Sequence, residues 1–272
     1  MTVPSSSIEQ GQAEGPLLEC RGVSIEFGGV KALTDVSVQL RRGQIVSIIG
    51  PNGAGKSTLF NCISGLIPPD SGEVIFNGGR IDGWPMHKVA RAGLVRTFQN
   101  IRMFPELTVG EILIVAQGGS ARSSILSTVL RLPSYRREWV DLKERACEAA
   151  ELLGLTEFIE MRASELPLLQ QRKVEIARCI VARPEVIMLD EPFAGSTARE
   201  ADELMNVVRG LKDRGISILL VEHTMRVVMQ LSEYIYVINF GKMVAAGDPG
   251  EVSDNVEVQS VYLATAKPKE TG

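Results

Sequence analysis

Cysteine is scarce in this sequence, and its spacing excludes two classes of protein. The 272 residues include four cysteines, which stand far apart along the chain: Cys20, Cys62, Cys147 and Cys179. Zinc sites need close cysteine pairs, and disulfide scaffolds need a much higher density of cysteine. We therefore expect four reduced thiols that fill the core.

Long apolar runs and an excess of basic residues are also missing. No apolar segment approaches the roughly 18 residues that span a bilayer, and the chain does not open with a basic stretch followed by an apolar core. The formal net charge of −4 gives no positive field that would attract nucleic acid or anionic lipid. We expect a protein that stays in the cytosol and has no nucleic-acid partner.

The length bounds the organisation of the chain. A chain of 272 residues can bury one substantial core, or a core with a smaller lobe inserted in it. Residues 1–16 are rich in Ser, Gln, Gly and Glu and are predicted to form a flexible tail, and residues 266–272 are predicted to form a second one. Residues 17–265 are then predicted to form a single domain.

A glycine-rich loop between a strand and a helix is the most informative feature that is present. The apolar run 45–49 is typical of a buried parallel strand, and residues 59–64 continue as a helix that stops at Gly65. Between them lies a P-loop pattern: Gly50, Pro51, Asn52, Gly53, Ala54, Gly55, Lys56, Ser57 and Thr58. This context predicts ATP or another nucleoside triphosphate, bound with Mg²⁺.

The residue types of the loop match the chemistry of a phosphate chain. Glycines let backbone N–H groups approach phosphate oxygens closely, and the start of the helix adds its partial positive charge. We expect Lys56 to reach the β- and γ-phosphates and the hydroxyl of Ser57 to ligate Mg²⁺. Thr58 can bond a more distal phosphate oxygen. The alternative is a glycine-rich turn that binds nothing.

The remaining pattern predicts three structural parts. Short alternating segments over 17–46 and 73–78 are typical of an antiparallel β-lobe. Helical signals over 109–117 and 135–153 favour an inserted helical lobe at 100–169. Short apolar runs separated by a helix predict parallel strands in an α/β core. Residues 17–99 and 170–265 would thus hold the β-lobe and a mostly parallel P-loop core.

A pair of acidic residues follows the apolar run 186–189. We expect Asp190 to lie at the carboxyl end of a parallel strand next to the P-loop strand, where it can hold Mg²⁺ through water. Glu191 projects differently and can polarise the attacking water as general base. The alternative is a solvated strand end.

Other candidates carry weaker signals. His223 follows the next apolar run and is expected at the carboxyl edge of the sheet, where it can touch the γ-phosphate or orient the water. Gln99 can ligate Mg²⁺ or the water through its amide oxygen, and Phe27 can stack on adenine. Each also has an ordinary interpretation: a surface histidine, a solvated glutamine and a core aromatic.

These signals stand in the order and approximate spacing of the ABC transporter ATPases, and the resemblance covers residues 17–265. Segments such as 27–33, 96–100, 104–109 and 258–263 are similar to those of ATP-binding subunits of branched-chain amino acid importers; urea or amide importers of the same subfamily remain an alternative. The resemblance implies an ATP-hydrolysing subunit that docks on a membrane permease at the cytoplasmic face of the membrane. It also implies a groove near Gln99 for the permease and, indirectly, a substrate-binding protein.

The sequence departs from this family at the signature loop. The family's Leu-Ser-Gly-Gly-Gln falls on residues 166–170, where Pro167, Leu168 and Leu169 replace the serine and both glycines. Pro167 removes a hydroxyl and an N–H, and the leucines add branched side chains where backbone should approach phosphate. Residues 194–198 and Thr224 also differ from the family pattern, on the same expected dimer face. Isolated drift is the alternative explanation.

The resemblance implies that each ATP lies between the P-loop of one subunit and the signature of the other. The hypothesis is therefore a competent half-site that hydrolyses ATP when it is paired with a second, different ATPase subunit. Two alternatives remain open. One is a regulatory subunit that binds ATP with little hydrolysis of its own, and the other is an ABC ATPase that acts without a membrane permease.

Overall fold

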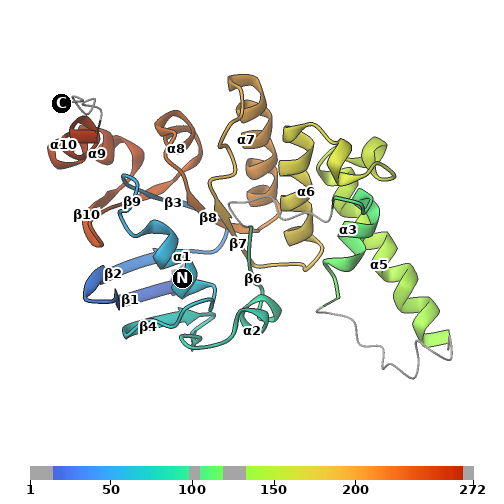
Figure 1. Ribbon diagram of the computed structural model, residues 1–272, viewed down its shortest axis with the longest axis horizontal. Helices are drawn as coiled ribbons and strands as arrows, with labels where there is room; N and C mark the ends of the chain where they lie inside the picture. The colour runs from blue at the N-terminus through green and yellow to red at the C-terminus, as the bar shows by residue number, and fades with distance from the viewer. Residues whose placement is uncertain (1–14, 98–104, 119–132, 266–272) are drawn as a thin grey trace, which may run out of the picture.

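The computed structural model describes residues 15–97, 105–118 and 133–265, and two β-sheets form its framework (Figure 1). The smaller sheet has the strand order β2-β1-β4-β5 and is antiparallel throughout. Its strands are β1 (Leu18–Phe27), β2 (Val30–Leu40), β4 (Ser71–Phe76) and β5 (Gly79–Arg80). This sheet confirms the predicted antiparallel β-lobe.

The larger sheet has the order β10-β9-β3-β8-β7-β6. Its strands are β3 (Ile45–Ile49), β6 (Leu94–Arg96), β7 (Val186–Asp190), β8 (Ser217–Val221), β9 (Tyr234–Asn239) and β10 (Lys242–Gly247). All neighbouring pairs are parallel except β9 and β10, which form an antiparallel hairpin. The predicted α/β class with a mostly parallel core is confirmed.

Helix α1 (Lys56–Ile63) lies between the two sheets (Figure 1). Its apolar side chains, among them Leu59 and Phe60, belong to one core cluster with residues from both sheets. Because side chains alternate across a strand, Met188 of β7 faces this cluster while Leu189 faces the cluster on the opposite side of the sheet. The start of α1 is therefore held firmly between two packed layers.

The opposite face of the larger sheet is covered by helices α6 (Leu168–Ile180) and α7 (Ala198–Asp213). Helices α3 (Val109–Val115) and α5 (Pro133–Leu152) pack beside α6 at one end of the molecule (Figure 1). Helical structure in this region agrees with the sequence pattern, whereas the limits of the lobe at 100 and 169 stay a prediction. The other helices are α2 (Met86–Arg91), α8 (Met225–Leu231), α9 (Pro249–Asp254), α10 (Val256–Thr265) and the 3-10 turns η1 (Thr156–Phe158) and η2 (Ala163–Glu165).

Two features differ from the sequence expectations. Three cysteines are buried, but Cys147 is exposed on α5, so the expectation that all four fill the core is wrong for this one. Periodicity also does not predict the short helices α2, α8 and α9, because six or seven residues make fewer than two full turns and leave little pattern to detect.

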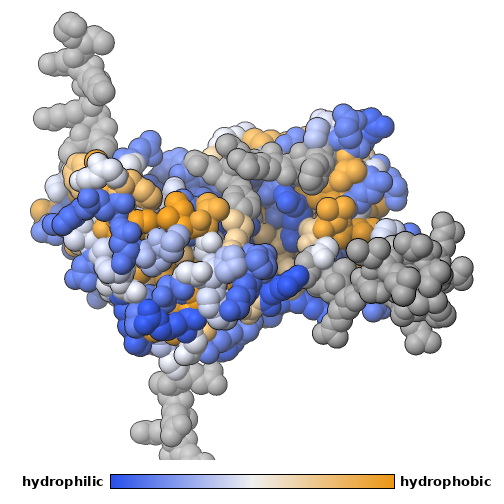
Figure 2. Space-filling model, turned by 60° about the horizontal axis from the view of Figure 1, so that its bottom comes forward, coloured by the Kyte–Doolittle hydropathy of each residue, from blue (hydrophilic) through white to orange (hydrophobic). Residues whose placement is uncertain are grey.

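None of the helices in the described part of the chain combines the length and apolar character needed to cross a bilayer. On the face shown in Figure 2, hydrophilic residues predominate and apolar residues form separate patches. Isolated exposed apolar groups of this kind are normal for a folded protein.

Candidate functional site

The loop between β3 and α1 is built so that only glycine fits at critical positions. A Cβ at Gly50 would lie 2.0 Å from the carbonyl oxygen of Ile238 in β9. Gly53 and Gly55 have φ angles of +78° and +105°, a backbone conformation that other residues adopt at a cost. Packing against β9 and the local turn thus both require the glycines that the sequence pattern singled out.

Lys56 stands at the first position of α1 and is only 5% exposed. Its ammonium donates hydrogen bonds to the backbone carbonyls of Gly50 and Pro51, at 2.8 and 3.0 Å. Burial lowers the pKa of Lys56, and the charges of nearby carboxylates oppose that shift. The ammonium is therefore held over the loop, where a bound phosphate chain would place its oxygens.

Asp190 ends strand β7, and its side chain is almost completely buried. One carboxylate oxygen accepts a 2.7 Å hydrogen bond from Arg96, whose side chain is 7% exposed. Its backbone N–H donates to the hydroxyl of Thr97. The second carboxylate oxygen, Oδ1, is buried and has no hydrogen-bond partner among the described residues.

The expected position of Asp190 needs one correction. The strand that carries it is not next to the P-loop strand, because β8 lies between β3 and β7. Sequence order does not fix strand order when each connection crosses over the sheet. Asp190 still lies near the loop, since its charge acts on the Lys56 ammonium.

Glu191 has a backbone conformation that is rare for a side chain other than glycine. Its φ is +49°, and its N–H donates to the carbonyl of Val221 at 2.9 Å. Glu191 lines the same cavity as the P-loop, whereas Asp190 is not among the lining residues. Strained backbone of this kind is held by the surrounding structure and is frequent at functional positions.

Sequence reasoning missed Glu222, which directly follows β8 and precedes His223. Its side chain is 0% exposed and accepts hydrogen bonds from the backbone N–H groups of His223 and Thr224. Burial raises the pKa of Glu222. The signal that would have found it is an acidic residue directly after a fully apolar strand.

His223 is half exposed at the carboxyl end of the larger sheet, as its position after β8 predicts. Its Nδ1 lies 3.5 Å from the Glu222 carboxylate. The buried Glu222 carboxylate therefore lies beside the imidazole ring at the edge of the site.

A cavity of about 420 Å³ brings Glu191 together with the P-loop, whereas Asp190, Glu222 and His223 are not among its lining residues. The residues that line it come from the P-loop, the start of β2, the position after β7 and the β9–β10 turn: Val30, Lys31, Ala32, Asn52, Gly53, Ala54, Gly55, Lys56, Ser57, Thr58, Glu191, Phe240 and Gly241. Phe27 is not among them; it ends β1 and is 47% exposed. Gln99 lies outside the described residues.

The residues present fit a magnesium ion bound together with phosphate. Asp190 offers a buried carboxylate oxygen without a protein partner in the described chain, and Ser57 faces the cavity. Within the described ranges no group of three or more His, Cys, Asp or Glu side chains could hold a metal by itself. Mg²⁺ commonly takes one or two protein ligands and completes its shell with phosphate and water, so a single carboxylate suits it.

The signature segment has a different character from the P-loop. Pro167 precedes α6, and the first helical residue, Leu168, is 39% exposed, whereas Leu169 is buried. A Cβ at Gly195 would lie 3.7 Å from Cδ2 of Leu168, so the leucine covers the loop that follows Glu191. A branched apolar side chain therefore occupies the start of the helix.

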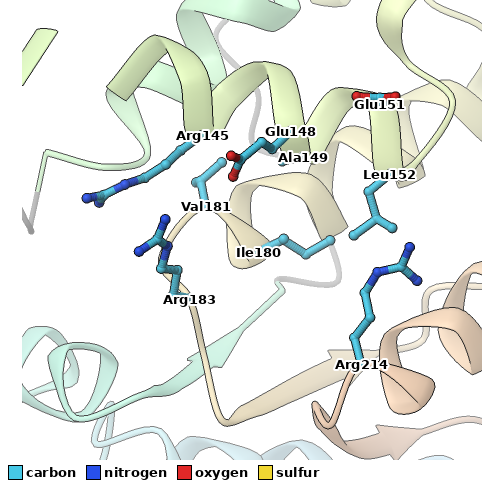
Figure 3. Close-up of a pocket in the computed structure, with 9 residues that line it drawn as sticks. All are labelled: Arg145, Glu148, Ala149, Glu151, Leu152, Ile180, Val181, Arg183 and Arg214. Atoms are coloured by element: carbon cyan, nitrogen blue, oxygen red, sulfur yellow. The ribbon is translucent and has the colours of Figure 1, made fainter. Parts of the chain in front are cut away.

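A second cavity of about 550 Å³ lies between α5 and the ends of α6 and α7 and shares no lining residue with the first. Figure 3 shows the arginine side chains that line it from three parts of the chain: Arg145 from α5, Arg183 from the segment after α6, and Arg214 at the end of α7. Arg214 donates to the carbonyl of Gly210, a typical helix C-terminal contact. The cavity carries none of the P-loop residues.

Comparison with known proteins agrees with this site. The family model described as ABC transporter matches residues 33–194. The high-affinity branched-chain amino acid transport ATP-binding protein BraF of Pseudomonas aeruginosa is 42% identical over 252 residues, which cover 92% of this chain and 99% of the relative. LivG of Escherichia coli K12, with the same description, is 42% identical over the same shares of the two chains.

Solved structures show the same likeness. A nucleotide-free ATP-binding cassette from an ABC transporter superimposes with a TM-score of 0.80 at 32% identity, covering 91% of this chain and 98% of that one. A cassette in its ADP conformation gives a TM-score of 0.81 at 31% identity, with 92% and 99% covered. The P-loop, the acidic strand end and these two likenesses together place this chain in the ABC transporter family.

Proposed function

We propose that this chain is the ATP-hydrolysing subunit of an ABC importer for branched-chain amino acids. The observation that carries the proposal is the cavity in which Lys56, Ser57 and Glu191 meet. The substrate class comes from relatives described as branched-chain amino acid transport proteins, which match this chain over nearly their whole length. The ATPase subunit itself does not contact the transported amino acid.

In the proposed mechanism the backbone N–H groups of the P-loop and Lys56 bind the β- and γ-phosphates of ATP. Ser57, Asp190 and Gln99 would hold Mg²⁺, which would neutralise charge on the phosphates. Glu191 would accept a proton from the attacking water, and its half-buried position at the cavity suits that role. His223, oriented by Glu222, would contact the γ-phosphate or the water.

The signature segment supports a partner that is a different subunit. The start of α6 lacks a hydroxyl and carries Leu168 at its exposed face, so its N–H groups are poorly placed to receive a phosphate. A second ATPase subunit with an intact signature would complete the site built on this chain's P-loop. Paired with itself, the chain would have a defective partner surface at both sites.

A groove between the catalytic core and the helical region suits the permease. This groove of about 210 Å³ is lined by residues of β6, the end of α3 and α6, including Val95, Ala116 and Cys179. It opens beside the segment that leads to Gln99. Docking there would place the chain peripherally at the cytoplasmic face of the membrane, with a substrate-binding protein on the other side of the permease.

The regulatory-subunit alternative rests on the same Pro167 and Leu168. Single-turnover hydrolysis separates it from the proposal. The chain is mixed with a partner ATPase whose own catalytic glutamate is replaced, and radiolabelled ATP is followed in one turnover. Hydrolysis that requires Glu191 of this chain supports the proposal. ATP that binds but stays intact would favour a regulatory subunit, and copurification without any permease would favour an ABC ATPase outside transport.

A further inference from the structure

Arg96 connects two elements of the core through one side chain. It lies in β6, and its guanidinium makes hydrogen bonds on two sides. On one side Nη2 donates to Oδ2 of Asp190, which ends β7, at 2.7 Å. On the other side Nη1 donates to Oδ1 of Asn61 in α1, at 2.7 Å, and to the hydroxyl of Ser64 just after α1, at 3.3 Å. The guanidinium therefore bridges β7 and α1.

This bridge is buried and rigid. The side chains of Arg96 and Asp190 are 7% and 3% exposed, and Cζ of Arg96 lies 5.4 Å from the centre of the Phe60 ring in α1. Because water is largely excluded, these hydrogen bonds are stronger than they would be at the surface. The donors of a guanidinium form a fixed planar fork, so they set a direction as well as a distance. The arrangement of Asp190 relative to α1 is thus fixed by a stiff group.

The bridge bears on the magnesium site because the proposed ligands Ser57 and Asp190 stand on these two elements. Ser57 is the second residue of α1, and Asp190 is the last residue of β7. Arg96 occupies Oδ2 of Asp190, which leaves the buried Oδ1, without a hydrogen-bond partner among the described residues, to face the ion. Groups that orient a metal ligand in this way commonly contribute about 10–100-fold to metal affinity.

We propose that Arg96 is a positioning residue for Mg²⁺, which holds Asp190 and α1 in the mutual arrangement that the ion needs. It acts through Asp190 and not on the ion directly. This inference rests on the proposed nucleotide-binding function. Lysine would keep the positive charge beside Asp190, but a single ammonium cannot reproduce the two-sided fork. One substitution therefore separates the geometry of the bridge from its charge.

The phosphate site itself has a support that does not involve Arg96. The N–H of Gly241, in the β9–β10 turn, donates to the carbonyl of Ala54 at 2.9 Å. A Cβ at Gly50 would lie 2.0 Å from the carbonyl oxygen of Ile238, so the loop also packs directly on β9. Loosening the bridge should therefore weaken the metal contribution and leave the binding of metal-free ATP in place.

The test measures ATP binding to the full chain with and without metal. Calorimetry gives the affinity for ATP in EDTA and the gain in that affinity when Mg²⁺ is added. We expect Arg96→Lys to reduce the gain about tenfold and to leave the affinity in EDTA unchanged. Asn61→Ala removes the neutral partner in α1 and should reduce the gain by a smaller factor. It also serves if Arg96→Lys does not fold, which urea denaturation shows.

Arg178→Lys is the matched control. Arg178 lines the same groove as Arg96, but it stands on α6 and pairs with the buried carboxylate of Glu175 at 2.6 Å. This variant loses an arginine fork away from β7 and α1, so its gain from Mg²⁺ should match that of the wild type. An equal reduction in Arg178→Lys and Arg96→Lys would contradict the proposed role.

A double variant gives a readout that a merely structural role would not produce. In an Asp190→Asn background, Arg96→Lys should cause no further reduction of the Mg²⁺ gain, because the carboxylate that it orients is gone. An unchanged gain in folded Arg96→Lys and Asn61→Ala, or an equal loss of affinity in EDTA, would overturn the positioning role. Failure of the wild type to bind ATP under either condition would instead overturn the proposed function.

Discussion

At the scale of single residues, Glu191 holds the most specific chemical role that we propose. It has a positive φ and lines the cavity of the P-loop, whereas Asp190 does not line this cavity. A general base contributes on the order of 10²-fold or more to the rate. A change at Glu191 should therefore affect ATP hydrolysis without affecting ATP binding.

Replacing Glu191 by glutamine should lower ATP turnover at least about 100-fold and leave ATP binding intact, because the amide cannot accept the proton of water. Steady-state phosphate release from the complex with partner ATPase and permease measures the first, and ATP titration measures the second. Glu160→Gln, an exposed acid away from the cavity, is the control. Unchanged transport by Glu191→Gln would remove this residue as the base.

Glu222 makes a pH-dependent prediction. Its pKa is raised by burial, so its ionised form destabilises the folded protein above that pKa, and the penalty disappears as the pH falls and the carboxyl takes up a proton. Glu222→Gln should therefore raise the free energy of unfolding at pH 8, with a gain that shrinks as the pH falls below the raised pKa. Urea denaturation from pH 8 to pH 5 measures it. A gain that grows towards acid pH would contradict the assignment.

At the scale of elements, the β3–α1 loop depends on the β9–β10 hairpin. Gly50 lies against the carbonyl of Ile238, and Ala54 accepts from Gly241. Gly50 in the loop and Ile238 in the hairpin are almost 190 residues apart in the chain. The shape of the phosphate site is therefore a product of two elements and not of the loop alone.

Gly50→Ala tests this contact, with Gly78→Ala as the matched control. Both glycines have positive φ, but a Cβ at Gly78 meets nothing within 4 Å, whereas one at Gly50 would lie 2.0 Å from backbone. Gly78→Ala should cost about 1 kcal/mol of stability, and Gly50→Ala about 1–3 kcal/mol more, with loss of Mg-ATP binding. Urea denaturation and calorimetry measure the two effects. Similar costs at the two sites would show that the loop can move away from β9.

At the scale of the whole molecule, the proposed partner face is the part that departs from the family. Pro167 and Leu168 mark the exposed start of α6, while Leu169 is buried and supports the helix. Pro167 and Leu168 can therefore be replaced by the residue types of the family signature without leaving a cavity in the core. This distinction allows a direct test of the different-subunit hypothesis.

The double variant Pro167→Ser/Leu168→Gly should raise the ATP turnover of the isolated chain at least about tenfold, because it restores a hydroxyl and an accessible N–H for the partner's γ-phosphate. Pro167→Ala/Leu168→Ala, which shortens the side chains without the hydroxyl, is the control. Phosphate release is measured at protein concentrations that drive pairing. Ordinary transporter rates for the unmodified chain alone would refute the need for a different subunit.

The sequence alone was sufficient for features whose cause is local. The span of β3, the P-loop and the strand end at Asp190 follow from apolar runs, glycine spacing and acidic residues, and these patterns have the same meaning wherever they fold. The difference between residues 166–170 and the signature loop of the family was also visible in the sequence. The roles proposed for Gln99 and Phe27 stay predictions, and Gln99 lies outside the described residues.

Tertiary structure alone decided which distant residues meet. It placed β8 between β3 and β7, buried Glu222 beside His223, and brought Phe240 to the cavity. No local pattern encodes these facts, because strand order and burial depend on how separate segments cross and pack. The sequence determined that this chain carries the parts of an ATP site, and the packing of the two sheets around α1 determined how those parts are arranged.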